Sequence, residues 1–514
     1  MPFISQFAFA ALLLSPVLAS GPWKQPLYKP DAEKASQVRD AFRTAWKGYY
    51  DHAFRHDSLL PLNNSFYDDR NGWGVTAIDS LSTAIVMEEG ETVSQILEFA
   101  STVDFTTTQE VNSEISLFES NIRYLGGLLA GYDLLTGPYK DLLTTNRDRK
   151  LVGRLLKQAQ ILGNSLSIAF STPTGIPDGT IYLNPKPRIN GSESNGPAGI
   201  GTLVLEWTRL SDLTGNKTYA QLAQKAEKYL TEPQGLPESF PGLVGNELGI
   251  KDGKFRSQFG SWGGGTDSYY EYLIKMYLYD PDEFGHYKDR WVAAAESSIK
   301  HLASHPTSRP DLTFLAAYNG TQIIPASGHL ASFVGGNFIL GGVLLGDAKY
   351  VDFGLALAES YYETYKGTAS GIGPELFRWA TDANRTVPAE YAESYKKAGF
   401  WTRLADYALR PETIESLYYA YRVTGYPKYQ DMVWSAFTTI RDRCRAGSGF
   451  AILDDVTKPD GGTKENFMES FFLAETLKYA YLTFAGEGKV HFQGYGKTTF
   501  VFNTEAHPLR IRHG

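Results

Sequence analysis

The sequence contains almost no cysteine. Cys444 is the only one among 514 residues, so an intrachain disulfide is impossible and the fold must depend on its hydrophobic core. A single cysteine also excludes zinc fingers, iron–sulfur clusters and a redox-active pair. No histidine lies near Cys444 in the sequence. We therefore interpret this cysteine as a structural residue rather than a nucleophile.

Excess positive charge and long apolar runs are also lacking. The formal net charge is -8, and we expect no nucleic acid partner, because such proteins usually carry a basic surface. The hydrophobic fraction of 42% is typical of a globular protein with a substantial core. After residue 20 no stretch contains 18 consecutive apolar residues, so we expect no membrane partner.

The mostly apolar run Phe7–Ala19 is too short to cross a membrane. It predicts a secretory signal peptide over residues 1–20. We expect residues 21–514 to form a single catalytic domain that is secreted and monomeric. Five Asn-x-Ser/Thr sequons agree with secretion, namely Asn63, Asn190, Asn216, Asn319 and Asn384.

Several catalytic motifs are absent from the sequence. It contains no G-x-S-x-G elbow, Walker loop, G-x-G-x-x-G or H-E-x-x-H. His52 and His56 have the i,i+4 spacing of a zinc pair, but no other histidine or cysteine is close in sequence. The pair therefore does not predict a zinc site.

Helical periodicity dominates the sequence. Alternation typical of strands is weak outside Val490–Phe502, which predicts a terminal β-hairpin. Pro185–Gly201 and Lys458–Asn466 are rich in glycine, proline and polar residues and predict surface loops. Helices are predicted over Val93–Phe105, Leu117–Leu135, Leu151–Phe170, Leu203–Leu213, Tyr219–Leu230, Tyr269–Tyr279, Trp291–Leu302, Glu412–Val423, Lys428–Ile440 and Met468–Phe484.

A glycine recurs between pairs of predicted helices. Three similar segments place a glycine directly after Thr, at Gly137, Gly215 and Gly425. Gly346 lies in a related segment. Each glycine fits the left-handed position after a helix. The intervals of 78 and 79 residues would each hold about two helical hairpins, which must stack or close on one another. The residues alone leave an open solenoid and a closed α/α toroid as alternatives.

Acidic side chains lie within apolar helical segments. Charges at such positions destabilise the fold, so their presence indicates a function. Asp267 and Glu271 are at i,i+4, and Glu412 and Glu415 are at i,i+3. Met468–Glu475 carries further acids, and Glu119 stands four residues before Arg123, the spacing of an ion pair. Converging carboxylates either bind a hard cation or perform acid–base hydrolysis, as in glycoside cleavage.

These segments resemble the signature motifs of glycoside hydrolase family 47, the class I α-mannosidases. The similarity runs from about Arg43 to Leu509. It is carried by Gly72–Asp79, Ile115–Gly127, Leu205–Ser211, Asp267–Leu273, Leu409–Ser416, Met468–Lys478 and Val501–Pro508.

The resemblance implies an all-α fold, an (α/α)7 barrel of helical hairpins closed into a toroid. It also implies inverting exo-hydrolysis of terminal α-mannose, most commonly α-1,2-linked, from high-mannose N-glycans with a bound Ca²⁺. By motif position Glu119 resembles the general acid, acting directly or through a water, Glu412 the base, and Asp267 a third catalytic carboxylate. Which acid takes which step stays open.

The resemblance further assigns binding roles. Thr504 would bind Ca²⁺ through its hydroxyl and its carbonyl oxygen, a donor set that suits a hard cation. Phe471 would pack on the apolar face of the sugar. The positions that would contact sugar or metal-bound water are Arg123, Glu206, Glu271, His329, Arg410, Glu415, Phe471, Glu475 and Glu505.

The sequence departs from the family pattern at three places. Ser332 and Tyr361 replace a cysteine pair that many members carry, and Gly265 replaces an arginine of the ER-type enzymes. The loop Pro185–Gly201 also differs, so an α-1,6 or other linkage preference is an alternative. A glycan-binding, catalytically weak protein of the ER quality-control type is a second alternative, but the presence of Glu119, Asp267 and Glu412 favours an enzyme.

Overall fold

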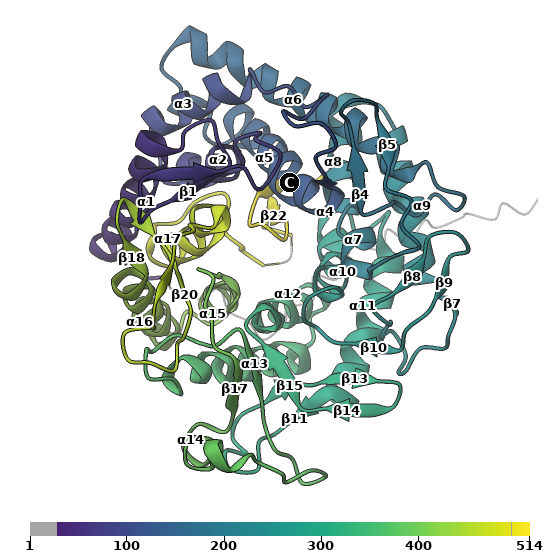
Figure 1. Ribbon diagram of the computed structural model, residues 1–514, viewed down its shortest axis with the longest axis vertical. Helices are drawn as coiled ribbons and strands as arrows, with labels where there is room; N and C mark the ends of the chain where they lie inside the picture. The colour runs from purple at the N-terminus through teal and green to yellow at the C-terminus, as the bar shows by residue number, and fades with distance from the viewer. Residues whose placement is uncertain (1–27, 495, 514) are drawn as a thin grey trace, which may run out of the picture.

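The computed structural model describes residues 28–494 and 496–513 (Figure 1). The predicted signal peptide, residues 1–20, lies outside the described residues. No described helix is long and apolar enough to cross a membrane.

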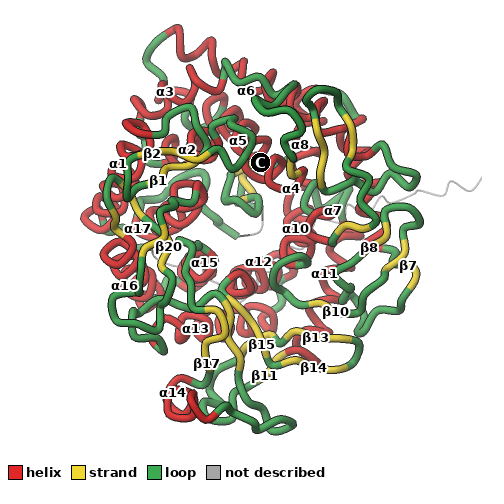
Figure 2. Tube along the Cα trace, viewed as in Figure 1, coloured by secondary structure: helices red, strands yellow, loops and turns green. Residues whose placement is uncertain are grey.

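Helical hairpins form a ring (Figures 1 and 2). Each inner helix packs on an outer helix, neighbouring inner helices pack on one another, and α17 contacts both α1 and α2, which closes the circle. The seven inner helices are α2 (Val75–Val86), α5 (Gly126–Thr136), α8 (Val204–Thr214), α10 (Asp267–Tyr279), α12 (Val334–Leu345), α15 (Glu412–Thr424) and α17 (Leu477–Phe484). Their outer partners are α3 (Gly90–Ala100), α6 (Asn146–Leu166), α9 (Thr218–Thr231), α11 (Gly285–Ser297), α13 (Ala348–Lys366), α16 (Pro427–Cys444) and α1 (Ala32–His52). The closed toroid is thus confirmed, and the open solenoid is excluded.

The two rings differ in their sequence pattern. Outer helices such as α6 bury one apolar stripe, whereas ten of the twelve residues of the inner helix α12 are buried. Glycines let α12 and α13 approach closely: a Cβ on Gly335 would lie 2.9 Å from Ala358. Because α12 is buried nearly all round, it has little amphipathic period, which explains why it was not among the predicted helices. The sequence patterns also missed α1, α2 and α13.

The predicted left-handed glycines are confirmed at three of four positions. Gly215, Gly346 and Gly425 have φ of 73°, 66° and 65° and follow α8, α12 and α15. The prediction is wrong at Gly137, where φ is -113°. Pro138 follows it, and the proline ring restricts the backbone of the preceding residue.

Two inner segments contain π-helical turns, η1 (Ser120–Leu125) and η7 (Phe472–Thr476). π-helical turns are frequent at functional sites. Here η1 carries Arg123 and η7 carries Glu475, so both turns present candidate site residues to the centre of the ring. The other short helices are α4 (Leu117–Glu119), α7 (Pro197–Gly201), α14 (Ala392–Ala398), η2 (Lys140–Leu142), η3 (Ser167–Phe170), η4 (Ser298–Leu302), η5 (Leu330–Phe333) and η6 (Ala389–Tyr391).

Short strands connect the helices. They are more numerous than the weak alternation of the sequence predicted. Segments of two to four residues are too short to show a period. The sheets are β1 (Ser58–Leu60) with β2 (Ser65–Tyr67); β3 (Ile115–Ser116) with β4 (Thr180–Tyr182) and β5 (Arg188–Ile189); β6 (Ser194–Asn195), β8 (Leu248–Gly249), β9 (Lys254–Phe255) and β7 (Gln234–Gly235); β10 (Phe259–Gly260), β13 (Ala317–Asn319) and β14 (Gln322–Ile324); β11 (Ala303–Ser304) with β12 (Phe314–Leu315); β15 (Ala326–Gly328), β16 (Leu376–Arg378) and β17 (Trp401–Leu404); β18 (Arg445–Ala446) with β19 (Gly449–Phe450); and β20 (Ile452–Leu453) with β21 (Lys464–Glu465). Among the strands in the described residues, only β7 and β9 pair in parallel.

The segment Pro185–Gly201 is not a plain surface loop. It contains β5, β6 and the short helix α7, whose Ala198 and Ile200 are buried. The predicted loop Lys458–Asn466 contains only the two-residue strand β21.

A β-hairpin enters the ring near the C-terminus (Figure 1). Strands β22 (Phe500–Phe502) and β23 (Pro508–Arg510) pair antiparallel and pack on α10 and α5. The predicted hairpin exists, but its bounds were wrong, since among the described residues of Val490–Phe502 only the last three are a strand. Its turn, Asn503–His507, therefore lies within the ring of helices.

Cys444 is free and buried, which agrees with a structural role. Burial raises the pKa of its thiol. At the two positions of the absent cysteine pair, the Ser332 hydroxyl donates to the His329 carbonyl at 2.6 Å, and the Tyr361 hydroxyl lies 2.6 Å from Ser327 Oγ.

Candidate active site

A cavity of about 440 Å³ lies inside the ring. Glu119, Asp267 and Glu412, which belong to three different hairpins, all line it, as does Gly265. The other predicted site residues in its wall are Arg123, Arg410, Phe471, Glu475, Thr504 and Glu505. These residues come from five chain segments that converge on one space.

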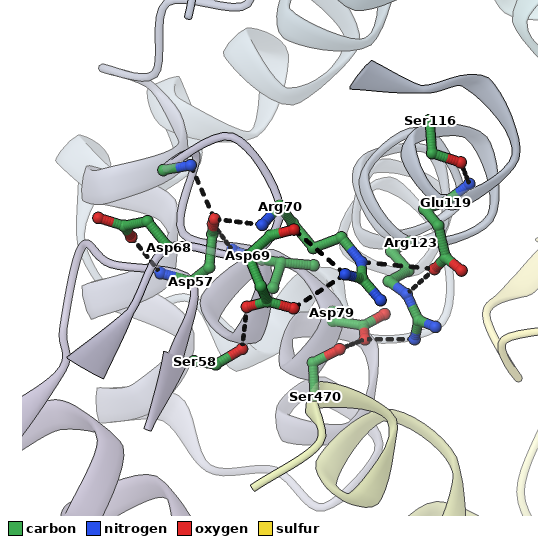
Figure 3. Close-up of polar contacts among 12 residues, drawn as sticks. Asp57, Ser58, Asp68, Asp69, Arg70, Asp79, Ser116, Glu119, Arg123 and Ser470 are labelled. Atoms are coloured by element: carbon green, nitrogen blue, oxygen red, sulfur yellow. Dashed lines mark hydrogen bonds and ion pairs between the residues drawn. The ribbon is translucent and has the colours of Figure 1, made fainter. Parts of the chain in front are cut away.

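Glu119 is the last residue of α4, and its backbone N–H is capped by Ser116 Oγ at 3.3 Å. Arg123 Nε donates to Glu119 Oε2 at 2.6 Å, and Arg70 Nε lies 3.7 Å from the same oxygen (Figure 3). Burial alone would raise the pKa of Glu119, but the charges of Arg123 and Arg70 outweigh it and lower the pKa. Glu119 is therefore held as a carboxylate.

Arg123 joins several acids. Besides Glu119 it pairs with Glu505, and its Nη1 lies 3.6 Å from Asp79 Oδ2. Its guanidinium also lies 5.3 Å from the ring centroid of Phe471. The predicted ion pair Glu119–Arg123 is confirmed, and it is buried rather than solvated, since the Arg123 side chain is only 8% exposed.

Glu412 is the first residue of α15, where the helix dipole favours a negative charge. Its Oε2 lies 2.7 Å from His329 Nδ1, and Arg410 is close by. Burial would raise the pKa of Glu412, but the contacts with His329 and Arg410 lower it. The residue is thus an ionised group, which suits a base.

Asp267 opens α10 and receives the Ser268 N–H at 2.9 Å. Burial raises its pKa to about 7, and the neighbouring charges of Glu271 and Glu412 act in the same direction. The three candidate catalytic carboxyl groups therefore differ in pKa. The pKa values of Glu119 and Glu412 are lowered, whereas that of Asp267 is raised to about 7.

Arg410 and Phe471 form another part of the wall. Two nitrogens of Arg410 donate to the two carboxylate oxygens of Glu375 at 2.6 and 2.8 Å. The Arg410 guanidinium lies 6.0 Å from the Phe471 ring centroid. Phe471 therefore lies near the guanidinium groups of both Arg123 and Arg410, and it presents an aromatic surface to the cavity.

A smaller cavity of about 50 Å³ has Asp267, Glu412, Glu475 and Thr504 in common with the first. Glu271 and Glu415 also line it. Burial raises the pKa of Glu415 to about 8, and it raises that of Glu475 well above its usual value. Repulsion from neighbouring carboxylates adds to both shifts.

This small cavity has the chemistry of a cation site. Five carboxyl groups face it. Lys275 pairs with Glu271, and His329 contacts Glu412. The Thr504 oxygens lie at the same place. Hard cations prefer such oxygen ligands, and a bound positive charge would relieve the repulsion. The predicted residues therefore fit a divalent cation.

Within the described residues, one group of potential metal ligands has its ligand atoms within 4.8 Å of one another, namely Asp280, Asp282 and His513. It lies away from the cavity residues, and Arg512 already donates to Asp280 at 2.9 Å. The group is therefore explained as part of an ion-pair cluster.

Two predicted residues lie behind the cavity walls. Glu206 accepts from Tyr272 at 2.6 Å and from Asn503 at 2.8 Å, and burial raises its pKa to about 7. It thereby fixes the hairpin turn that carries Thr504. His329 contacts Glu412 and Tyr365.

The sequence patterns gave no role to several residues of the site. Glu375 holds Arg410, and Asp79 pairs with Arg123 and lies 3.0 Å from His507 Nε2. Asp79 was within a recognised motif, so its position in an apolar helix was the available signal. Glu375 immediately precedes β16 and stands 35 residues before Arg410. The sequence holds no signal that links the two.

Comparison with known proteins agrees with this geometry. The model of glycosyl hydrolase family 47 matches residues 41–511. The chain belongs to glycosyl hydrolase family 47. It is 53% identical over 498 residues to a probable mannosyl-oligosaccharide alpha-1,2-mannosidase 1B of Aspergillus clavatus, covering 95% of this chain and 96% of the relative. A mannosyl-oligosaccharide alpha-1,2-mannosidase of Penicillium citrinum is 50% identical over 484 residues, covering 94% and 93%.

A solved structure also resembles this family 47 hydrolase. The alpha-1,2-mannosidase from Trichoderma reesei superposes with a TM-score of 0.93 at 56% identity, over 94% of this chain and 100% of that chain. A cellobiose 2-epimerase from Bacillus thermoamylovorans has a TM-score of 0.51 at 12% identity, covering 88% and 98%, and it has only the fold in common.

Proposed function

We propose that this hydrolase is an exo-acting α-mannosidase that removes terminal α-1,2-linked mannose from high-mannose oligosaccharides with the help of Ca²⁺. The observation that carries the proposal is the convergence of Glu119, Asp267 and Glu412 on one cavity. The names of the relatives support the linkage. Exo action is supported by the hairpin turn, because Thr504 and Glu505 of this turn line the cavity inside the ring.

The carboxyl groups can divide acid–base work between them. Inversion needs one group that takes a proton from the attacking water and another that gives a proton to the leaving oxygen. Glu412, ionised and oriented by His329, suits the first task. Asp267 holds a proton near neutral pH, whereas Glu119 must first receive one, directly or through a water, before it can act as the acid. Phe471 would support the apolar face of the sugar.

Thr504 would hold the Ca²⁺ through its hydroxyl and carbonyl oxygens, with Glu271, Glu415, Glu475 and Glu505 facing its waters. When bound, the ion supplies a positive charge among these carboxylates. The described residues support the site through the acidic lining of the smaller cavity.

Gly265 leaves the cavity mouth open. Its φ is 93°, and a Cβ added there would meet no atom within 4 Å. This supports access for several branches of a branched glycan.

We further propose a single secreted domain, monomeric and N-glycosylated. The five sequon asparagines, Asn63, Asn190, Asn216, Asn319 and Asn384, are all exposed, as glycosylation requires.

The test is incubation of the calcium-loaded protein with a Man9 oligosaccharide, α-1,2-mannobiose and α-1,6-mannobiose. We expect release of mannose from the first two and much slower release from the third. Preferred cleavage of the α-1,6 disaccharide would change the linkage assignment. Tight binding of Man9 without release would support the alternative of a catalytically weak, glycan-binding protein.

A further inference from the structure

A second cavity adjoins the proposed active site. Its volume is about 540 Å³, and it lies between the loop Ser261–Gly264 and the sheet of β15, β16 and β17, which Figure 2 shows at the lower rim of the ring. Gly264 and Leu330 line both cavities. The dividing wall is thin at this point, because Gly264 has no side chain and a Cβ there would already touch Leu330 at 3.5 Å.

A shared ion pair also links the two cavities. Glu375 lines the second cavity, while both of its carboxylate oxygens bind Arg410, which lines the first. A molecule that extends from the first cavity past Gly264 would therefore stay in contact with a continuous wall.

The second cavity exposes apolar side chains that water solvates poorly. Of ten exposed large hydrophobic residues in the described chain, three line it: Phe259, Leu376 and Leu404, with exposures of 40%, 48% and 47%. Leu376 and Leu404 are direct cross-strand partners in β16 and β17. Together these residues form an exposed apolar surface that can cover the apolar face of a sugar ring.

The same cavity offers unused hydrogen-bond donors. Arg378 and Arg403 line it, and both are exposed. Among the described residues, neither guanidinium has a hydrogen bond or ion pair to another side chain. Each carries five N–H donors that can reach hydroxyl groups of a ligand. An apolar surface flanked by free donors suits a neutral sugar, whose rings have an apolar face and a hydroxylated edge.

We propose that this second cavity binds mannose units of the same oligosaccharide whose terminal mannose occupies the active site. The inference rests on the proposed function, since the occupant is identified by continuity with that site. It predicts a preference for long, branched substrates over disaccharides, because a disaccharide held by its terminal unit does not extend past Gly264.

The test compares kcat/KM for Man9 and for α-1,2-mannobiose in variants of the second cavity. The variants are Arg378→Ala combined with Arg403→Ala, and Leu404→Ser. Each should lower kcat/KM for Man9 about 10-fold or more, mainly through KM, since hydrogen bonds to charged groups and buried apolar contacts each reach this size. For mannobiose the value should stay within about 2-fold. Arg147→Ala and Leu236→Ser, two exposed sites outside the cavity, serve as matched controls.

Each outcome is decisive. No change with either substrate, or an equal loss with both, would overturn the second subsite and leave the proposed function standing. If the wild type hydrolyses neither substrate, the proposed function fails, and calorimetry then tests the subsite alone. In that measurement Man9 should bind the Glu412→Gln protein about 10-fold more tightly than the same protein carrying Arg378→Ala and Arg403→Ala.

Discussion

His329 connects Glu412 to Tyr365. Its Nδ1 lies 2.7 Å from Glu412 Oε2, and its Nε2 lies 2.7 Å from the Tyr365 hydroxyl. Because both ring nitrogens are engaged and the side chain is only 1% exposed, the imidazole is fixed in position. It in turn fixes the direction of the carboxylate that we propose as the base.

Replacing His329 should therefore impair the chemical step more than binding. In His329→Phe an aromatic ring is kept but both hydrogen bonds are lost. A hydrogen bond to a charged group contributes about 1.5–3 kcal/mol, so kcat should fall about 10- to 150-fold with little change in KM. Steady-state kinetics on Man9 check this. A variant that changes KM alone would show that His329 contacts the sugar instead of positioning Glu412.

Replacing the carboxyl groups themselves should lower kcat more than replacing His329. Glu412→Gln and Glu119→Gln keep the side-chain shape and remove a proton acceptor or donor, so each should lower kcat on Man9 about 10²–10⁴-fold. Asp267→Asn should behave similarly. The variants should remain folded, because a neutral amide reduces repulsion among the buried acids.

An activated substrate separates the acid from the base. An α-mannoside with a leaving group that needs no proton should restore the rate in the variant that lacks the acid, either Glu119→Gln or Asp267→Asn. It should not restore Glu412→Gln. Restored turnover in Glu412→Gln would contradict its assignment as the base.

Removal of the metal should abolish turnover. Treatment with EDTA leaves the acids of the smaller cavity without a neutralising charge, and Ca²⁺ should restore activity better than Zn²⁺ because the donors are all oxygens. Thr504→Val removes the hydroxyl ligand at similar volume and should weaken calcium affinity, measured by calorimetry on the metal-free protein. Full activity in protein shown by elemental analysis to contain no calcium would refute the cofactor.

Glu227, in the outer helix α9, should make the stability depend on pH. It is 1% exposed, and neither carboxyl oxygen has a hydrogen-bond partner among the described residues. Burial raises its pKa to about 8, although the charge of Arg290 opposes this shift. In the unfolded chain a glutamate titrates near pH 4.3. Between these values the folded protein binds a proton that the unfolded chain does not, so stability falls as the pH rises through about 8.

The matched variant is Glu227→Gln, which stays neutral at every pH. From about pH 5 to about pH 8.5 the Tm of the wild type should fall a few degrees more than that of the variant, as scanning calorimetry would measure. Parallel curves would show that Glu227 does not carry this proton. Tyr269 and Tyr287, which also face the carboxyl group, do not titrate in that range because burial raises the pKa of both hydroxyls.

Much of the site was predictable, because a charged group in an apolar helix destabilises the fold and therefore indicates a function. This argument identified Asp267, Glu271 and Glu415. It could not find the partners, because His329 and Glu412 are 83 residues apart and Arg123 and Glu505 are 382 apart. Those pairs depend on ring closure. Ring closure itself came from the family resemblance, since periodicity alone allowed a solenoid.

Other features were hidden for physical reasons. Helix α12 is buried on nearly every side and therefore shows little amphipathic pattern. The rim strands have two to four residues, too few to display alternation. The second cavity combines Gly264 with strand residues from β16 and β17, and its apolar and cationic surface exists only after these segments pair.

The stereochemistry of the first sugar released tests the central claim most directly. Proton NMR of α-1,2-mannobiose hydrolysis, recorded before mutarotation, should show β-mannose, because Glu412 activates a water that attacks from the face opposite the leaving group. Initial release of α-mannose would mean a covalent glycosyl-enzyme intermediate. That result would contradict both the inverting mechanism and the role of Glu412 as the base.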